Sequence, residues 1–266
     1  MKKKFNFQKF YLILIMIFFY APILYVVLFS FNADSSLSSF KGFSLRWYEK
    51  MFSSRPMMES IYYSLLVAVV ATIISTIVGT ITAIGLSKSN RVIKEIVTQV
   101  NNLPMLNPDI VTAISLMLFF TTLAIPSSFG TLLTAHVVFC IPYVMLSVGP
   151  KLRQLDDNIA EAALDLGCTP FESLVKVIIP QIKEGIISGA IVAFTMSFDD
   201  FVISYFTMPP GMNNISTYVY SASKRINPSI NSLSTLIVLA VTIVLIVMNV
   251  LPVIKERKLK KNEKTC

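Results

Sequence analysis

Three aspartates stand out as groups that could do chemistry, because each lies within an otherwise uncharged apolar stretch. They are Asp109, Asp199 and Asp200. A charged aspartate at the centre of a membrane helix costs about 2.5–3.5 kcal/mol on insertion scales, so such residues usually face a water-filled cavity or a polar partner. No lysine or arginine lies in these stretches to neutralise them, and burial also favours the protonated form. Two roles therefore stay open: contact with a cationic substrate along a pathway, or hydrogen bonding that holds helices or subunits together.

Other residue types offer little further chemistry. His136 is the only histidine, and a lone histidine cannot complete a metal site or a catalytic triad, so we expect it to make a hydrogen bond inside a helix bundle. Asp199 and Asp200 are adjacent, which on a continuous helix directs them about 100° apart. One could face a pathway while the other bonds a neighbouring helix or subunit. The cysteines lack the spacing of metal ligands or of a disulfide framework: Cys140, Cys168 and Cys266. We expect no metal and no cofactor.

The composition indicates an integral membrane protein. Of 266 residues, 54% are hydrophobic and 14% are charged, whereas a soluble domain carries about a quarter charged residues. Gly79 and Gly85 are not followed, at the spacing that a phosphate-binding loop needs, by a Lys-Ser/Thr pair, and an apolar stretch is the wrong context for such a loop. We therefore expect no catalytic residues, and an energy source outside this chain for any active process. The net charge of +8 is concentrated next to apolar stretches, as membrane orientation signals are, which argues against nucleic acid as a partner.

Six apolar stretches follow one another along the chain, separated by polar segments. They lie at about 10–31, 61–86, 97–124, 129–148, 186–208 and 233–254. A helix needs about 20 apolar residues to cross a bilayer, so the sequence predicts an all-α polytopic membrane protein with six transmembrane helices. The third stretch is the least regular, because it contains Pro104, Asn107, Pro108 and Asp109. Such breaks survive at membrane depth only when they are buried in protein or line a water-filled cavity.

The placement of basic residues predicts the orientation. With the N-terminus inside, the segments expected in the cytoplasm hold 17 of the 23 lysines and arginines, which the positive-inside rule favours. The first apolar stretch is too long for the core of a signal peptide and lacks a cleavage site, so we expect it to be retained. The chain then divides into an N-terminal helix with an extracytoplasmic segment (1–60), a transmembrane domain (61–254) with a cytoplasmic loop at about 151–183, and a basic cytoplasmic tail (255–266). Both termini are expected in the cytoplasm of a cell with this protein in its plasma or inner membrane.

The loop at about 151–183 has the local pattern of two short helices joined by a glycine. Apolar residues recur at helical spacing through 159–166. Gly167 follows them, at the position where a left-handed C-cap favours glycine. Residues 169–172 (Thr-Pro-Phe-Glu) predict a new helix start, with the threonine as cap, the proline in the first helical position and the glutamate completing a capping box. Pro180 is expected to stop or kink the helix that follows.

This pattern resembles the EAA loop of ABC-importer permeases, which reads E-A-A, three residues, Gly, nine residues and I-x-L-P. Val177 and Ile179 stand in place of the isoleucine and the leucine. In that family the loop is a cytoplasmic coupling helix that docks on the ATPase subunit, so the resemblance implies the type I ABC importer (MetI-like) permease fold. The alternative is an ordinary amphipathic loop helix. The resemblance assigns ATPase coupling to the matching residues, Glu161, Ala162, Ala163, Gly167 and Pro180.

A second resemblance concerns the cargo. Segments 107–110 (Asn-Pro-Asp-Ile) and 197–204 (Ser-Phe-Asp-Asp-Phe-Val-Ile-Ser) are similar to the S-P-D-I and S-x-D-D-x-V-x-S segments of spermidine/putrescine permeases, although Asn107 replaces a serine. The resemblance implies a permease subunit of an ATP-driven polyamine importer, with the three aspartates along its half of the pathway. The implied partners are an ABC ATPase dimer, a second permease subunit, an extracytoplasmic polyamine-binding protein and the lipid bilayer.

Three alternatives stay open. The same importer family could carry another cargo, such as iron, thiamine or another small solute. A self-contained secondary carrier or channel would need no ATPase, but it leaves the EAA loop unexplained. A membrane scaffold without transport leaves the intramembrane aspartates unexplained.

Overall fold

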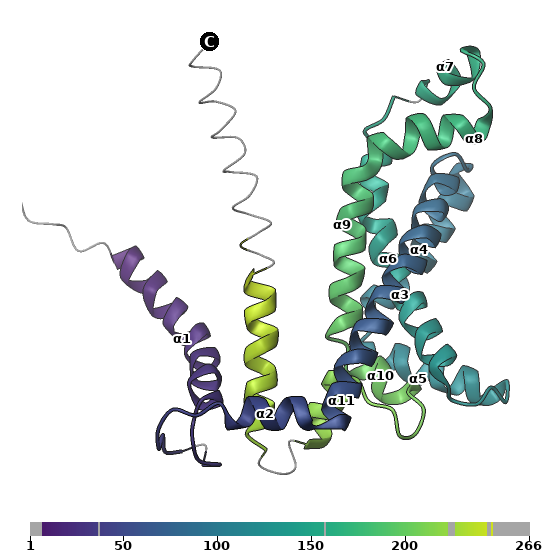
Figure 1. Cartoon of the computed structure of the whole chain (residues 1–266). Helices are drawn as coiled ribbons and strands as arrows, with labels where there is room; N and C mark the ends of the chain where they lie inside the picture. The colour runs from purple at the N-terminus through teal and green to yellow at the C-terminus, as the bar shows by residue number, and fades with distance from the viewer. Residues whose placement is uncertain (1–6, 37, 157, 223–226, 244–245, 247–266) are drawn as a thin grey trace, which may run out of the picture. The chain divides into compact units, whose positions relative to one another are not determined.

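The structure, a computed structural model, describes residues 7–36, 38–156, 158–222, 227–243 and 246. These residues are helical or irregular, apart from one isolated bridge between Asn32 and Phe43, which confirms the predicted all-α class. The predicted basic tail at 255–266 lies outside the described residues. Figure 1 shows the helices in chain order: α1 (Phe7–Ser30), α2 (Arg46–Ser53), α3 (Arg55–Ser87), α4 (Arg91–Leu106), α5 (Asp109–Thr122), α6 (Phe129–Leu152), α7 (Ile159–Asp165), α8 (Pro170–Ser173), the π-helix η1 (Leu174–Ile178), α9 (Ile179–Phe198), α10 (Val202–Thr207), α11 (Ile215–Ala222) and a helix at Ser229–Ile243.

The helices agree with the predicted apolar stretches. Within the described residues, four helices are long and apolar enough to cross a membrane: Lys9–Ser30, Arg55–Ser87, Phe129–Leu152 and Pro170–Phe198. The pair α4 and α5 covers the third predicted stretch. The shorter helix at Ser229–Ile243 is the described part of the sixth stretch, which continues beyond the described residues. This set is compatible with six spans.

The break in the third stretch is a sharp turn. α4 and α5 are bent by 107° relative to each other, with a break of only a few residues between them. Asn107 has an extended backbone with ψ of 147°, which is the conformation favoured before a proline. Pro104, by contrast, stays inside α4. The turn therefore coincides with Pro108, and it places Asp109 in the first turn of α5.

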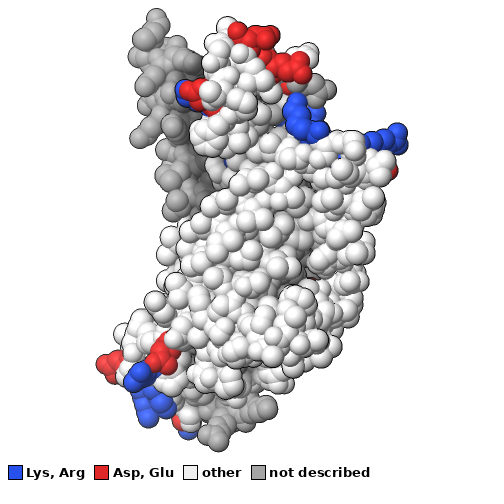
Figure 2. Space-filling view, turned by 90° about the vertical axis from the view of Figure 1, so that its right-hand side faces the viewer, with Lys and Arg blue, Asp and Glu red and all other residues white. Residues whose placement is uncertain are grey.

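The chain forms two compact units, one comprising Met1–Met58 and Ser221–Cys266 and the other Glu59–Tyr220. All lysines and arginines of the second unit lie at 88–94 or 151–183. Figure 2 shows charged side chains at the upper end of the view and again at its lower left, with a long uncharged surface between them. Along residues 62–81 of α3, the exposed side chains are large and apolar, as at Ile73, Ile77 and Ile81. Such a surface fits lipid hydrocarbon rather than water.

In the first unit, Asn32 organises the segment that follows α1. Its buried side-chain amide donates to the carbonyls of Ser36 and Ser39, with N···O distances of 2.8 Å each. Its Oδ1 accepts from the backbone N–H of Lys41 at 2.8 Å. The indole N–H of Trp47 donates to the Asn32 carbonyl at 2.8 Å. One asparagine thus fixes both the loop and the start of α2.

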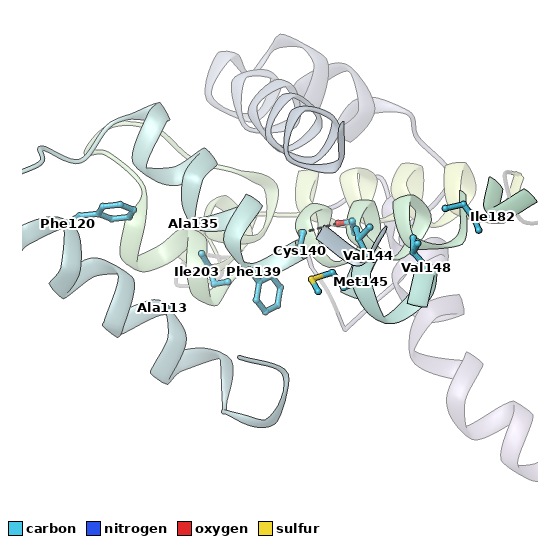
Figure 3. Close-up of a cluster of buried hydrophobic side chains, with 12 residues drawn as sticks. Ala113, Phe120, Ala135, Phe139, Cys140, Val144, Met145, Val148, Ile182 and Ile203 are labelled. Atoms are coloured by element: carbon cyan, nitrogen blue, oxygen red, sulfur yellow. Dashed lines mark hydrogen bonds between the residues drawn. The ribbon is translucent and has the colours of Figure 1, made fainter. Parts of the chain in front are cut away.

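In the second unit, glycines allow two helices to approach α6 closely. A Cβ added at Gly79 of α3 would lie 2.9 Å from the Val144 side chain, and one added at Gly189 of α9 would lie 3.2 Å from Val144 Cα. In lipid, where helix association depends on van der Waals packing, small residues permit this close contact. Figure 3 shows a cluster of buried side chains from α6 and from the helices packed against it. They include Ala135, Phe139, Cys140, Met145, Val148, Ile182 and Ile203.

Candidate functional site

The loop between α6 and α9 has the predicted glycine C-cap. α7 ends at Asp165, and Gly167 has a φ of 86°, in the left-handed region that favours glycine. The Gly167 N–H donates to the Leu164 carbonyl (N···O 2.9 Å), and the Cys168 N–H donates to the Ala163 carbonyl (3.1 Å). These two bonds form a Schellman motif, which satisfies carbonyls at the end of α7. The prediction of a left-handed cap at Gly167 is confirmed.

α8 begins with the predicted capping box. Thr169 Oγ1 accepts from the backbone N–H of Glu172 (3.3 Å), and Glu172 Oε2 accepts from the backbone N–H of Thr169 (3.0 Å). Beyond it, Pro180 does not stop the helix, because α8 runs through η1 into α9. A proline lacks an N–H and crowds the preceding turn, and a wider π turn relieves this. Figure 1 shows the helix bending between the segments labelled α8 and α9, so of the two predicted effects the kink is found.

The loop presents apolar side chains outward. Leu166 is 86% exposed and Phe171 is 72% exposed. Glu161 and Ala162 are also exposed, whereas Ala163 is buried, on the opposite side of α7. α7 contacts α8 and η1, so Ala163 lies where the two short helices pack. An exposed apolar surface beside a carboxylate is typical of a protein interaction site.

A cavity of about 640 Å³ lies between this loop and the ends of α3, α4 and α6. Its charged lining residues are of both signs, with Lys88, Lys94 and Arg153 facing Asp156 and Glu161. Glu161 is the only predicted coupling residue among those that line it. The mixed charges give the cavity no evident preference for an anion or a cation.

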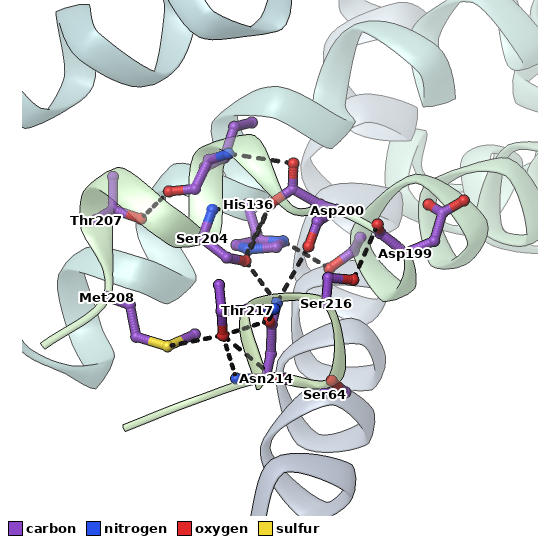
Figure 4. Close-up of polar contacts among 12 residues, drawn as sticks. Ser64, His136, Asp199, Asp200, Ser204, Thr207, Met208, Asn214, Ser216 and Thr217 are labelled. Atoms are coloured by element: carbon purple, nitrogen blue, oxygen red, sulfur yellow. Dashed lines mark hydrogen bonds and ion pairs between the residues drawn. The ribbon is translucent and has the colours of Figure 1, made fainter. Parts of the chain in front are cut away.

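Asp200 lies in a break between α9 and α10, where its side chain is only 7% exposed. Its Oδ1 accepts from the Ile203 N–H (3.2 Å), and its Oδ2 accepts from both the N–H and the hydroxyl of Ser204 (2.8 and 3.0 Å). These bonds satisfy N–H groups in the first turn of α10, as an N-cap residue does. Figure 4 shows the carboxylate directed into this polar cluster. The position of Asp200 is therefore that of a helix cap inside the protein.

His136 of α6 joins this break to α9. It is 1% exposed, its Nδ1 lies 2.8 Å from Ser197 Oγ and its Nε2 lies 3.0 Å from Ser204 Oγ. Because the Ser204 hydroxyl donates to Asp200, it accepts from His136, which places the imidazole proton on Nε2 and lets Ser197 donate to Nδ1. Nε2 also lies 3.7 Å from Asp200 Oδ2. The hydrogen bond predicted for His136 inside the bundle is confirmed.

Asn214 fastens α11 to the same break. Its Nδ2 donates to the carbonyl of Asp200 (3.1 Å) and to the hydroxyl of Ser204 (2.8 Å). The next backbone N–H, that of Ile215, donates to Ser64 Oγ of α3 (2.7 Å). Our reading of the sequence missed Asn214, which lies in a polar segment between two apolar stretches. The available signal was a cap-forming side chain directly before an apolar helix.

Asp199 differs from its neighbour, because its carboxylate is exposed and points away from the polar cluster (Figure 4). Its main-chain carbonyl accepts from the Ser216 hydroxyl at 3.2 Å. α9 ends at Phe198, so the expectation that Asp199 and Asp200 share a continuous helix is wrong: Asp200 leaves the helix in order to cap the next one. Asp109 is exposed in the first turn of α5, outside the hydrogen bonds described here.

Apolar spanning helices around a buried polar break, with an exposed helix–glycine–helix loop at one end, define a helical membrane transport subunit. The sequence matches the family described as "Binding-protein-dependent transport system inner membrane component" over residues 75–261. The chain belongs to this family. It is therefore a permease component rather than an enzyme, and the matched range includes the loop, the α4–α5 turn and the α9–α10 break.

Two relatives agree with the predicted resemblance. Over 233 residues the chain is 39% identical to the putrescine transport system permease protein PotI of Escherichia coli (strain K12), covering 83% of this chain and 82% of that protein. Over 222 residues it is 34% identical to the spermidine/putrescine transport system permease protein PotC of Haemophilus influenzae, covering 83% and 86% respectively. The predicted similarity to spermidine/putrescine permeases is confirmed.

A solved structure agrees with the predicted fold. It is the crystal structure of a bacterial ABC transporter involved in the import of the acidic polysaccharide alginate, with a TM-score of 0.68. The alignment covers 94% of this chain and 95% of the other, at 15% sequence identity. At this identity the likeness concerns the fold alone, and it confirms the ABC-importer permease fold.

Proposed function

We propose that this chain is one permease subunit of an ATP-driven importer of polyamines such as spermidine and putrescine, and that it forms half of the translocation pathway. The observation that carries the proposal is the similarity to two permeases named for these polyamines, over 83% of this chain in each case. ATP hydrolysis takes place on a separate ABC ATPase dimer. A second permease resembling PotB completes the pathway, and an extracytoplasmic binding protein resembling PotD delivers the substrate.

The loop formed by α7 and α8 couples the permease to the ATPase. Leu166 and Phe171 offer an exposed apolar contact, and Glu161 can pair with a basic residue on the ATPase. Closure of the ATPase dimer pushes the coupling loops of the two permeases together, which rocks the permeases between inward-open and outward-open states. The loop and both termini lie in the cytoplasm in this arrangement. The residues assigned to coupling are Glu161, Ala162, Ala163, Gly167 and Pro180.

The three aspartates serve the pathway in different ways. Asp109 and Asp199 are exposed on spans that carry no lysine or arginine beside them. An exposed carboxylate at membrane depth is costly in lipid, so these two face water or a partner subunit. Asp200 supports the pathway from inside, by holding the break that presents Asp199. A polyamine has several positive charges separated by methylenes, and a few weak acidic contacts let it pass without being trapped.

Reconstitution of the complete complex in proteoliposomes tests this function. We expect ATP-dependent uptake of radiolabelled spermidine or putrescine when the binding protein is present. Asp199→Asn should slow this uptake several-fold while leaving basal ATPase activity largely intact, because it removes a contact without disturbing the fold. If the complex does not transport polyamines but transports iron, thiamine or another solute, the proposed cargo is wrong and the assignment to the importer family stands. Uptake by this chain alone, without ATP, would instead favour a secondary carrier.

A further inference from the structure

Three aromatic rings form a cluster at the break between α9 and α10. The ring centroid of Phe201 lies 5.4 Å from that of Tyr205 and 4.9 Å from that of Tyr220, and the two tyrosines are 5.8 Å apart in a T-shaped contact. Tyr205 is 53% exposed and Tyr220 is 47% exposed. A ring that packs in the core of this unit is far less accessible, as Phe139 is at 4%. The cluster therefore leaves aromatic surface open on the outside of the unit.

The cluster is tied to the exposed carboxylate of Asp199 from two sides. Phe201 is two residues after Asp199 in the same break. Ser216 of α11 donates its hydroxyl to the Asp199 carbonyl at 3.2 Å, and Tyr220 lies one helical turn after Ser216, on the same face of α11. The acid and Phe201 thus lie in the break, Tyr205 lies on α10 and Tyr220 lies on α11, which is bonded to the break through Ser216. The hydrogen bonds of Asp200 hold the break in shape.

We propose that Asp199, Phe201, Tyr205 and Tyr220 form a contact site for a primary alkylammonium group, namely one charged end of the transported polyamine. This inference rests on the proposed function and names the groups that would meet the substrate. The ring faces attract a cation through their quadrupole, and the carboxylate adds opposite charge. The same rings provide apolar contact for the methylenes next to the ammonium. No lysine or arginine occurs in residues 185–220; the next ones along the chain, Lys224 and Arg225, lie outside the described residues.

A lipid-facing role does not account for this surface. Exposed tyrosine is common at membrane interfaces, but the exposed carboxylate of the neighbouring break would be expelled from hydrocarbon. A wet cavity, or the seam with a second permease, accommodates both groups. The site is open on one side, which suits a pathway that must release its cargo.

Substitution of the exposed rings tests the proposal in the reconstituted complex. At a saturating concentration of polyamine-loaded binding protein, we expect Tyr205→Leu and Phe201→Leu each to lower spermidine uptake about three- to tenfold, the range that a cation–π contact supplies. Polyamine moved per ATP hydrolysed should fall as well. Tyr205→Phe and Phe201→Tyr keep an aromatic face and should stay within about twofold of wild type. Tyr62→Leu is the matched control, since it removes a 60% exposed tyrosine elsewhere in the unit, and should change nothing.

The ratio of uptake to ATP hydrolysis separates a substrate contact from a folding defect. A variant that merely misfolds loses uptake and stimulated ATPase activity together, so an unchanged ratio in the leucine variants would overturn the site. Full uptake by both leucine variants, or an equal loss in their aromatic replacements, would also overturn it and leave the polyamine function standing. Absence of polyamine uptake in the wild-type complex would remove the proposed function and the site with it.

Discussion

The α7–α8 loop and the α9–α10 break are both places where one helix ends and another begins, but they are held in opposite ways. In the loop, every capping bond joins residues within five positions of each other, as from Gly167 to Leu164. In the break, Asp200 caps α10 locally, but the Ser204 hydroxyl that it shares is also bound by His136 and Asn214, from α6 and the start of α11. The loop is thus sensitive to changes in its own backbone, and the break to the loss of a polar group far away in sequence.

The largest loss of transport is expected from Gly167→Val, which changes the backbone conformation of the loop. A β-branched residue is strongly disfavoured at a φ of 86°, so the Schellman turn should open and α8 should lose its alignment with α7. We expect more than tenfold loss of uptake and of binding-protein-stimulated ATPase activity, with normal insertion into the membrane. Gly85→Val is the control, because Gly85 lies within α3 with no neighbour within 4 Å of an added Cβ. Equal loss in both variants would count against a special role for the loop.

The break should respond to His136→Leu with a loss of stability. Removing the imidazole leaves the buried hydroxyl of Ser197 without its acceptor, at a cost of about 1–3 kcal/mol for one unsatisfied group, whereas Ser204 keeps its bonds to Asp200 and Asn214. Thermal denaturation of the detergent-solubilised complex should therefore begin at a lower temperature, and uptake should fall with it. Asp199→Asn, which changes an exposed neighbour of the same break, should leave the denaturation temperature unchanged. A His136→Leu variant as stable as wild type would show that the hydrogen bonds of His136 do not stabilise the break.

A milder test of the loop is Thr169→Ala. Loss of an N-cap hydroxyl typically costs about 1 kcal/mol. The Glu172 N–H would lose its acceptor and the Glu172 carboxylate would lose one of its donors, while the bond from the backbone N–H of residue 169 would remain. We expect a fall of at most about fivefold in stimulated ATPase activity, the factor that corresponds to that free energy. Thr82→Ala provides the comparison, because that exposed hydroxyl bonds only a carbonyl within its own helix. If the two variants behave alike, capping of α8 does not limit coupling.

The smallest effect is expected from Asp109→Asn. Asp109 is exposed in the first turn of α5, where a carboxylate interacts favourably with the helix dipole by about 0.3–1 kcal/mol, and an amide retains part of that contact. Spermidine uptake should fall by less than about twofold. A larger loss than in Asp199→Asn would move the main acidic contact from the α9–α10 break to the α4–α5 turn.

The sequence by itself was sufficient for the features that depend on neighbouring residues. Apolar length predicted the spanning helices, because a bilayer sets how many residues must lie in lipid. Gly167 and Thr169 predicted the two caps, because a cap is decided within one helical turn. For Pro180, the sequence predicted a disturbance of the helix but did not decide between a stop and a kink. Its effect on the helix depends on whether the preceding turn can widen, and in this chain η1 does so.

Tertiary structure alone decided which aspartate is buried. Asp199 and Asp200 are chemically identical and adjacent, so no local pattern separates them. What separates them is that His136, 61 residues before Ser197 and 68 before Ser204, arrives beside the break on α6. Asn214 arrives there from the other side. A buried carboxylate is tolerated only where donors converge on it. The donors to Asp200 are local, namely two N–H groups in the first turn of α10 and the Ser204 hydroxyl, but the packing of α9 on α6 brings His136 to that hydroxyl and so encloses the cap.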